Sequence, residues 1–318
     1  MTKSGIKNNE NLFKKFDDQI TICAHDAGAA QHLLKIYDDN ISKTKLCLEG
    51  PALNIFNTKY KNLKIYDLKN SLEGSKYLIS GTGWSSTLEH NARKAALNDG
   101  IFNISIIDHW VNYSERFQRG KEIILPNEIW VTDEEAEKLA CSIFKEIPIN
   151  KIPNFWLDDL KNKVISKKSL FANKFPNSPP ARLLYLTEPI RSNWGGIESG
   201  EFQSMRYFFK NLKNLSNENY ISPIKDIEEI IIKLHPSEEL SKYDDLLNEL
   251  NLNIPIKVNE KIDLIDLLSG AEACFGCETQ ALVVSIACGL PTYSVIPPWG
   301  PKCRLPHNEI KHIRNIIC

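Results

Sequence analysis

Short apolar runs alternate with amphipathic segments along most of the chain. In the first half, the apolar runs predict five strands, at residues 19–24, 45–48, 77–80, 103–107 and 128–131. Segments whose apolar residues recur every three to four positions predict helices between and after these strands, at 31–37, 85–97 and 133–144. Strands that alternate with helices are typical of a mostly parallel, doubly wound sheet.

The alternation stops at residues 153–181 and then begins again. This stretch is polar, has a helical pattern only over 158–166 and ends in prolines, so it predicts a connection between domains. After it the pattern predicts strands at 182–186, 227–234, 256–258, 271–275 and 291–295, and helices at 202–215, 240–250, 263–268 and 279–288. The predicted architecture is α/β, with two Rossmann-like doubly wound domains, 1–152 and 182–318, that face a cleft.

Composition and charge exclude several classes of protein. The 318 residues carry a net charge of −1, which argues against a protein that binds the phosphate backbone of a nucleic acid. Residues 1–18 are polar and lack the apolar core of a signal peptide. No apolar run approaches the roughly 20 residues of a membrane span. We therefore expect a cytoplasmic protein with no transmembrane segment, for which peripheral membrane contact stays open.

The cysteines give no sign of a metal site. Cys274 and Cys277 form a C-x2-C pair, but no second pair has the spacing that would complete four zinc ligands. In a chain without an export signal, the eight cysteines are expected to be reduced and mostly buried. The sequence therefore predicts no metal and no cofactor.

Two motifs in the second half stand directly after predicted strands. They are Lys233-Leu234-His235-Pro236 and Gly276-Cys277-Glu278-Thr279. Open α/β sheets bind ligands at the carboxyl ends of their strands, where a His N–H and a helix N-terminus suit a phosphate. Pro236 fixes the chain direction after the His. The alternative is that His235 caps a loop and Thr279 caps a helix.

A third strand end in the second half offers further donor-side groups. The segment Thr187-Glu188-Pro189-Ile190-Arg191 follows the strand at 182–186. Arg191 could clamp a diphosphate through two parallel hydrogen bonds, with Glu188 in the same turn. A solvated loop is the alternative. Glu278 would repel a phosphate, so we expect it to accept hydrogen bonds from ribose hydroxyls or to cap the helix.

Three strand ends in the first half carry groups that suit an acceptor and a base. His25-Asp26-Ala27-Gly28 contains a glycine that lets the backbone approach a ligand. The small residues of Gly81-Thr82-Gly83 could line the acceptor side, and in Asp108-His109-Trp110 the indole could stack on a sugar ring. The alternatives are helix capping by Asp26, plain turn chemistry at 81–83 and a structural loop at 108–117.

Transfer to a hydroxyl needs a base that removes the hydroxyl proton. A carboxylate or an imidazole suits that task. The candidates are His25, Asp26, Asp108 and His109, and the sequence does not choose among them.

The order and spacing of the second-half motifs resemble the GT-B glycosyltransferase superfamily. Within it, the chain is similar to the bacterial surface-polysaccharide branch of sialyltransferase-like, capsule and polyol-phosphate transferases. The residues that carry the resemblance are Lys233-Leu234-His235-Pro236, Ala271 to Thr279, and Cys288-Gly289-Leu290-Pro291-Thr292. The first half departs from the common pattern, because it has His25-Asp26-Ala27-Gly28 where many members have a Gly-Gly-x-Gly-His loop.

The resemblance implies a donor site that works without a metal. The His-Pro element would contact the donor phosphate, and the turn at 276–279 would offer backbone N–H groups and a hydroxyl to the same phosphate. The implied activity is transfer of a sugar from a nucleotide-activated donor to a surface-glycan-type or other hydroxyl acceptor. A nucleotide-sugar epimerase or hydrolase, an alditol-phosphate transferase, and a non-catalytic nucleotide-sugar-binding subunit are the alternatives.

Overall fold

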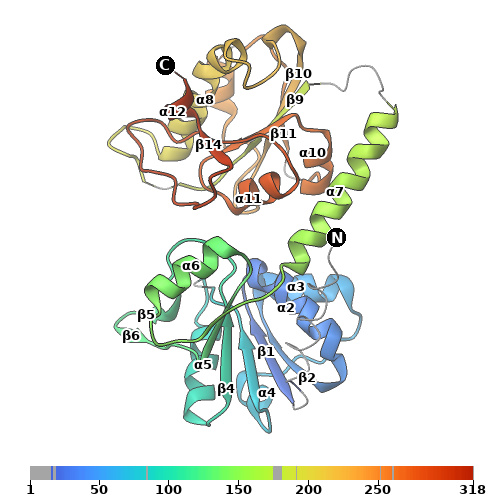
Figure 1. The fold of residues 1–318 in the computed structure, drawn as a ribbon, viewed down its shortest axis with the longest axis vertical. Helices are drawn as coiled ribbons and strands as arrows, with labels where there is room; N and C mark the ends of the chain where they lie inside the picture. Colours follow the sequence, from blue (N-terminus) through green and yellow to red (C-terminus); the bar gives the residue numbers. More distant parts are fainter. Residues whose placement is uncertain are drawn as a thin grey trace. The chain divides into compact units, whose positions relative to one another are not determined.

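Two units of similar architecture make up the chain (Figure 1). The computed structural model describes residue 16 and residues 19–83, 85–174, 181–190, 192–250, 252–259 and 261–317. The contacts divide the chain into Met1–Trp156 and Leu157–Cys318. Each unit contains one six-stranded parallel sheet covered by helices. The predicted α/β class with two Rossmann-like sheets is therefore confirmed.

The sheet of the first unit has the strand order β2-β1-β3-β4-β7-β8, and every neighbouring pair is parallel. The chain leaves β1 toward one edge of the sheet and returns on the other side of β1 as β3. The loops after β1 and β3 diverge for this reason, and doubly wound sheets bind ligands at such a point. The strands are β1 (Ile20–Ala24), β2 (Thr44–Leu48), β3 (Tyr77–Ser80), β4 (Phe102–Ile106), β7 (Glu128–Val131) and β8 (Ile149–Lys151).

The helices of the first unit cover both faces of this sheet. Along β1, Ile22 packs in a cluster with residues of α2 and α3, whereas Cys23 packs in a second cluster with residues of α5. Both faces are thus buried, as expected of a parallel sheet. The helices are α2 (Ala27–Asn40), α3 (Gly50–Lys59), α4 (Leu68–Leu72), α5 (Leu88–Asn98) and α6 (Glu134–Ile143), and a short antiparallel pair is formed by β5 (Gln118–Arg119) and β6 (Glu122–Ile123).

The sheet of the second unit has the order β11-β10-β9-β12-β13-β14, again parallel throughout. Here the chain reverses direction between β9 and β12, so the loops after these two strands diverge. The strands are β9 (Ala181–Leu186), β10 (Ile227–Lys233), β11 (Ile256–Asn259), β12 (Ala273–Gly276), β13 (Thr292–Ser294) and β14 (Ile310–His312), and the helices are α8 (Gly200–Asn217), α9 (Asp244–Leu250), α10 (Leu264–Gly270), α11 (Gln280–Ala287) and α12 (Ile313–Ile316).

Aromatic side chains fill the core of the second unit between α8 and the sheet. The Phe208 ring on α8 lies with its centroid 4.6 Å from that of Phe275 on β12, and Phe275 stacks on Tyr293 of β13 at 5.1 Å. Tyr185 of β9 extends the cluster at 5.2 Å from Phe208. These contacts fix the strands whose carboxyl ends carry the candidate donor-side residues.

Several elements differ from the sequence prediction. Helix α3 was not expected, because Gly50-Pro51 indicates a turn. Pro51 in fact stands in the first turn of this helix, where a backbone N–H has no partner within the helix and proline is therefore tolerated. The strand predicted at 291–295 is not the last one, since the three-residue β14 pairs beyond it. The stretch 153–181, predicted as a connection, contains the long helix α7 (Phe155–Lys174). No helix in the described part of the chain is both long and apolar enough to span a bilayer.

Candidate functional site

The loops after β9 and β12 bring two carboxylates together in the second unit. Gly276 ends β12, and a side chain there would meet the carbonyl oxygen of Leu186 on β9 at 2.9 Å, so only glycine fits without a backbone shift. Two residues later the backbone N–H of Glu278 donates to Oε2 of Glu188 at 2.9 Å. The point where this sheet reverses direction is therefore lined by Glu188 and the 276–279 turn.

Burial raises the pKa of Glu188 to about 7. The nearby carboxylate of Glu278 adds to this, while the hydrogen bond from the Glu278 N–H and the charge of Arg304 act in the opposite direction. A carboxyl with this pKa changes charge near neutral pH. In its protonated form it can both donate and accept a hydrogen bond, as a ribose hydroxyl requires.

Glu278 is held by a cation that the sequence analysis did not find. Arg304 donates its backbone N–H to Glu278 Oε2 at 3.0 Å and its Nε to Oε1 at 3.0 Å, and its Nη2 also contacts Oε1. Arg304 lies 26 residues beyond Glu278, outside any motif, so the sequence carries no local signal for this pair. The guanidinium is half exposed and supplies positive charge at the edge of the site.

The turn after β10 engages one of the two ring nitrogens of His235. Its Nδ1 accepts the backbone N–H of Ser237 at 3.2 Å and lies 2.8 Å from the Ser237 hydroxyl. This pattern assigns the ring proton to Nε2, which has no hydrogen-bond partner among the residues that the structure describes. Burial lowers the pKa of His235, so the ring is neutral at pH 7 and offers a single N–H.

The His235 turn is organised by Glu238, a residue that the sequence analysis also missed. The backbone N–H of His235 donates to Glu238 Oε2 at 3.1 Å, and the hydroxyl of Thr187 contacts the same oxygen. Tyr243 and Lys242 donate to Oε1 at 2.7 and 2.6 Å. Burial raises the pKa of Glu238, but these hydrogen bonds outweigh it and bring the pKa below its usual value. The ionised Glu238 side chain thus connects the loops that follow β9 and β10.

The remaining donor-side candidates lie as follows. Thr279 is the N-cap of α11 and accepts the Ala281 N–H at 3.4 Å, which is the capping role that the sequence allowed as an alternative. Pro236 is exposed at the turn after His235. Arg191 lies outside the described residues. The thiols of the C-x2-C pair have different neighbours: Cys277 donates to Ser204 at 3.1 Å, and Cys274 interacts with Ser285.

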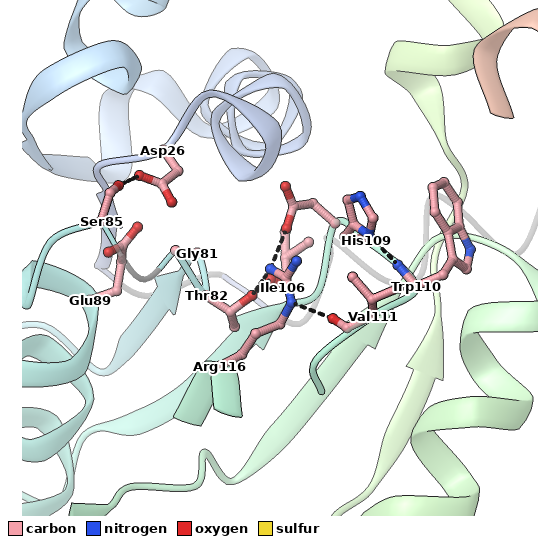
Figure 2. A network of polar contacts seen from close by, with 12 residues as sticks. Asp26, Gly81, Thr82, Ser85, Glu89, Ile106, His109, Trp110, Val111 and Arg116 are labelled. Carbon is pink, nitrogen blue, oxygen red and sulfur yellow. Dashed lines mark hydrogen bonds and ion pairs between the residues drawn. The ribbon is translucent and has the colours of Figure 1, made fainter. Parts of the chain in front are cut away.

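In the first unit, the end of β1 carries a His–Asp pair. Nδ1 of His25 lies 2.7 Å from Oδ1 of Asp26, and the hydroxyl of Ser85 donates to the same oxygen. A carboxylate on Nδ1 holds the proton there and leaves Nε2 as the basic nitrogen. Figure 2 shows Asp26 and Ser85 pointing toward each other beside Glu89. Gly83 leaves room for the Asp26 carboxylate, because a side chain at 83 would occupy the same space.

The end of β4 carries a carboxylate of a different kind. Asp108 Oδ1 pairs with Nη1 of Arg116 at 3.0 Å, and Gly28 leaves the space that the Asp108 carboxylate occupies. The same Arg116 nitrogen reaches the Thr82 hydroxyl at 3.3 Å, and Nε donates to the carbonyl of Val111 at 3.2 Å (Figure 2). Asp108 therefore has a buried cation as its partner, unlike Asp26.

The residues after Asp108 turn partly inward. Trp110 is 6% exposed, and its indole N–H donates to Asp133 at 2.7 Å, which leaves little of the ring to stack on a sugar. His109 Nδ1 accepts the backbone N–H of Trp110 at 2.9 Å. The hydroxyl of Thr82 donates to the carbonyl of Ile106 at 3.1 Å, so this hydroxyl serves the link between β3 and β4.

A buried glutamate and a buried arginine on α5 hold these loops through backbone hydrogen bonds and were not predicted. Glu89 on α5 is fully buried and accepts the backbone N–H of His25 at 2.9 Å. One turn later, Arg93 donates to the carbonyl of Gly81 at 3.1 Å, and its guanidinium lies over the Phe117 ring. Burial raises the pKa of Glu89. The helical spacing of Glu89, Arg93 and Ala96 on one face was the available signal, since charged residues on an apolar face need a partner.

Comparison with known proteins identifies the fold. No protein-family model matches the chain, and no curated protein matches its sequence. Among solved structures, a UDP-GlcNAc 2-epimerase from Methanocaldococcus jannaschii matches with a TM-score of 0.57 and 13% identity over 87% of this chain and 83% of that one. A UDP-GlcNAc 2-epimerase from Neisseria meningitidis bound to UDP-GlcNAc gives 0.53 and 13% over 83% and 78%. A glycosyltransferase from Rickettsia africae gives 0.52 and 9% over 90% and 81%.

The chain has the GT-B fold. The resemblance inferred from the second-half motifs is thereby confirmed at the level of architecture. At identities of 9–13%, the likeness carries the fold and not the reaction.

Proposed function

We propose that the chain is a GT-B glycosyltransferase that binds a nucleotide-activated sugar on its second unit. The observation that carries the proposal is the Nε2–H of His235, which has no partner in the described part of the chain and stands at a strand end beside the reversal point of a Rossmann sheet. A neutral imidazole N–H, the Arg304 guanidinium and the N-terminus of α11 together favour a phosphate. Glu188, with a pKa of about 7, suits the ribose.

The first unit would supply the base. His25 is the better candidate, because Asp26 holds its Nδ1 proton at 2.7 Å and leaves Nε2 as the acceptor. Asp108 is a weaker candidate, since its Oδ1 is already engaged by Nη1 of Arg116 at 3.0 Å. In the proposed reaction, Nε2 of His25 takes the proton of an acceptor hydroxyl. The hydroxyl oxygen bonds to the anomeric carbon, and the bond from that carbon to the donor phosphate breaks to release the nucleotide.

Thermal-shift measurements with CMP, CDP, UDP and GDP test the donor site. A nucleotide that binds the native state raises Tm by mass action. We expect His235→Ala to abolish the shift, and His235→Gln to restore part of it because its amide N–H stands in for Nε2–H. Glu239→Ala is the control, an exposed neighbour in the same turn. Equal shifts in wild type and His235→Ala would exclude a phosphate at His235.

Product analysis separates transfer from the alternatives. Incubation of the protein with the nucleotide sugar that stabilises it, with and without a hydroxyl acceptor, should yield a glycoside only when the acceptor is present. A new epimer or a free sugar without acceptor would instead identify an epimerase or a hydrolase. Binding without turnover would identify a nucleotide-sugar-binding subunit.

A further inference from the structure

The outer side of α8 carries a pocket that no step of the proposed reaction uses. Its volume is about 270 Å³, below the range of pockets for drug-sized ligands, so it suits one or two small rings. Two aromatic side chains form its walls, Tyr207 from α8 and Trp299 from the loop after β13. Their ring centroids are 5.7 Å apart and the planes meet at 78°, so the rings form a corner.

Trp299 is held in place although its ring is exposed. Its indole N–H donates to Oε1 of Gln203 at 2.6 Å, and 59% of the residue remains accessible. The amide nitrogen of Gln203 is itself bound, to the carbonyl oxygens of Asn193 and Glu198. The indole N–H is thus used within the protein, and the ring face is what the pocket offers to a ligand. A large apolar surface fixed in one orientation loses little entropy when it binds.

Polar and charged side chains surround this aromatic corner. Arg206 donates to Glu198 from Nε and Nη2 at 2.9 Å each, and also to Glu249 at 2.7 Å. With Lys210 at the rim, two cations and one carboxylate line the pocket, and Glu249 holds Arg206 from outside the lining. The Tyr207 hydroxyl and the Lys210 ammonium have no hydrogen-bond partner among the described residues. Arg206 is held by two carboxylates, so the Tyr207 hydroxyl and the Lys210 ammonium can serve as donors to the oxygen atoms of a ligand.

We propose that this pocket is a saccharide subsite that takes a neutral pyranose residue of a glycan. A pyranose has an apolar C–H face that packs on an indole and a rim of hydroxyls that pair with polar side chains. A planar nucleobase would favour two parallel rings, which the 78° corner does not provide. The inference concerns binding on the second unit and does not depend on the identity of the nucleotide donor.

The test is direct saccharide binding, with methyl β-glucopyranoside, N-acetylglucosamine, maltotriose and chitotriose as probes. Saturation-transfer NMR and tryptophan fluorescence titrations are run on wild type, Trp299→Ala, Tyr207→Phe and Ile197→Ala. We expect at least one saccharide to bind wild type. Trp299→Ala should weaken that binding about tenfold or more, and Tyr207→Phe about two- to tenfold. Ile197 is fully exposed and lies outside the pocket, so Ile197→Ala should bind as wild type does.

Three results would overturn the inference. They are no saccharide contact in the wild type, binding that persists in both Trp299→Ala and Tyr207→Phe, and a Trp299-dependent response to inorganic phosphate or UDP instead of to sugars. Thermal shifts with nucleotides, measured on the same variants, distinguish a failure of the saccharide subsite from a failure of the donor site. Trp299→Ala should leave those shifts intact, whereas His235→Ala should remove them and leave saccharide binding unchanged.

Discussion

The backbone N–H of Glu278 donates to the side chain of Glu188 across the reversal point of the second sheet, at 2.9 Å. This contact places two carboxylates side by side, and the Arg304 side chain donates to Glu278. Burial and the Glu278 charge raise the pKa of Glu188 to about 7, above its ordinary value of 4.5. Between these two pH values, the folded protein binds a proton that the unfolded chain does not.

The pH dependence of stability follows from this shift. The contribution of protonated Glu188 is fully present below about pH 4.5 and is lost as the pH rises through about 7. We expect Glu188→Gln, which keeps an acceptor for the Glu278 N–H, to gain stability relative to wild type across this window. Thermal unfolding of both proteins from about pH 5 to pH 8 measures the difference. Parallel curves would show that Glu188 titrates normally.

Glu238 provides a second prediction, which couples stability to ligand binding. Its carboxylate is almost fully buried and holds His235, Thr187, Tyr243 and Lys242. Glu238→Gln removes one of the two carboxylates that Lys242 faces, the other being Glu201 at 2.7 Å, and we expect the free energy of unfolding to fall by about 2–4 kcal/mol. Nucleotide affinity should fall as well, because Glu238 and the Thr187 hydroxyl together hold the His235 backbone N–H, at 3.1 and 2.8 Å, and the neutral amide holds this turn less tightly. Glu239→Gln is the exposed control. Urea unfolding and nucleotide thermal shifts measure the two effects, and a loss of stability with unchanged nucleotide binding would separate Glu238 from His235.

The strand ends could be predicted because their chemistry is local. The apolar run before His235 and the small residues around Gly276 predict both the strand and its exit within a few positions. Gly276 is needed because of a close approach to Leu186, and such a glycine has a signature in the sequence. The same reasoning placed His25 and Asp26 directly after a strand, although not the contact between their side chains.

The partners of those residues could not be predicted, because they come from distant segments. Arg304 reaches Glu278 from 26 positions away, and Glu89 meets the His25 backbone across 64 positions. Neither separation follows from helical or strand periodicity. The ring of Trp110 was expected to face a ligand, but Asp133 draws its N–H into the protein. Which side of a loop a residue faces depends on packing that the local pattern does not contain.

The assignment of the base to His25 provides a third prediction. If His25 removes the proton of the acceptor hydroxyl, His25→Ala should lower kcat by about 10²–10⁴-fold. Asp26→Asn should lower it as well, because the Nδ1 proton loses its carboxylate and the ring can take the wrong tautomer. Asp108→Asn should have a smaller effect on kcat. Each variant is measured as kcat and KM against pH with the donor identified by thermal shift. A larger loss in Asp108→Asn than in His25→Ala would move the base to Asp108.

Glu89 gives a fourth prediction, in which charge and hydrogen bonding can be separated. Its Oε1 accepts the His25 N–H at 2.9 Å, while Oε2 has no partner among the described residues. Glu89→Gln keeps an acceptor for His25 and has no charge to bury. Because burial raises the pKa of Glu89, the stability that its protonated form contributes to the wild type is lost as the pH rises. The free energy of unfolding of Glu89→Gln should therefore increase relative to that of the wild type between acidic and neutral pH.

Glu89→Leu has the opposite outcome, because it leaves the His25 N–H without its acceptor and removes a negative charge near the buried Arg93 guanidinium. We expect the free energy of unfolding to fall by about 3 kcal/mol, together with a loss of activity through His25. Glu146→Gln, an exposed site in the same unit, controls for the substitution itself. Urea unfolding at two pH values and kcat for each variant test the role. If Glu89→Leu is as stable and active as Glu89→Gln, the carboxyl does not hold His25 in place.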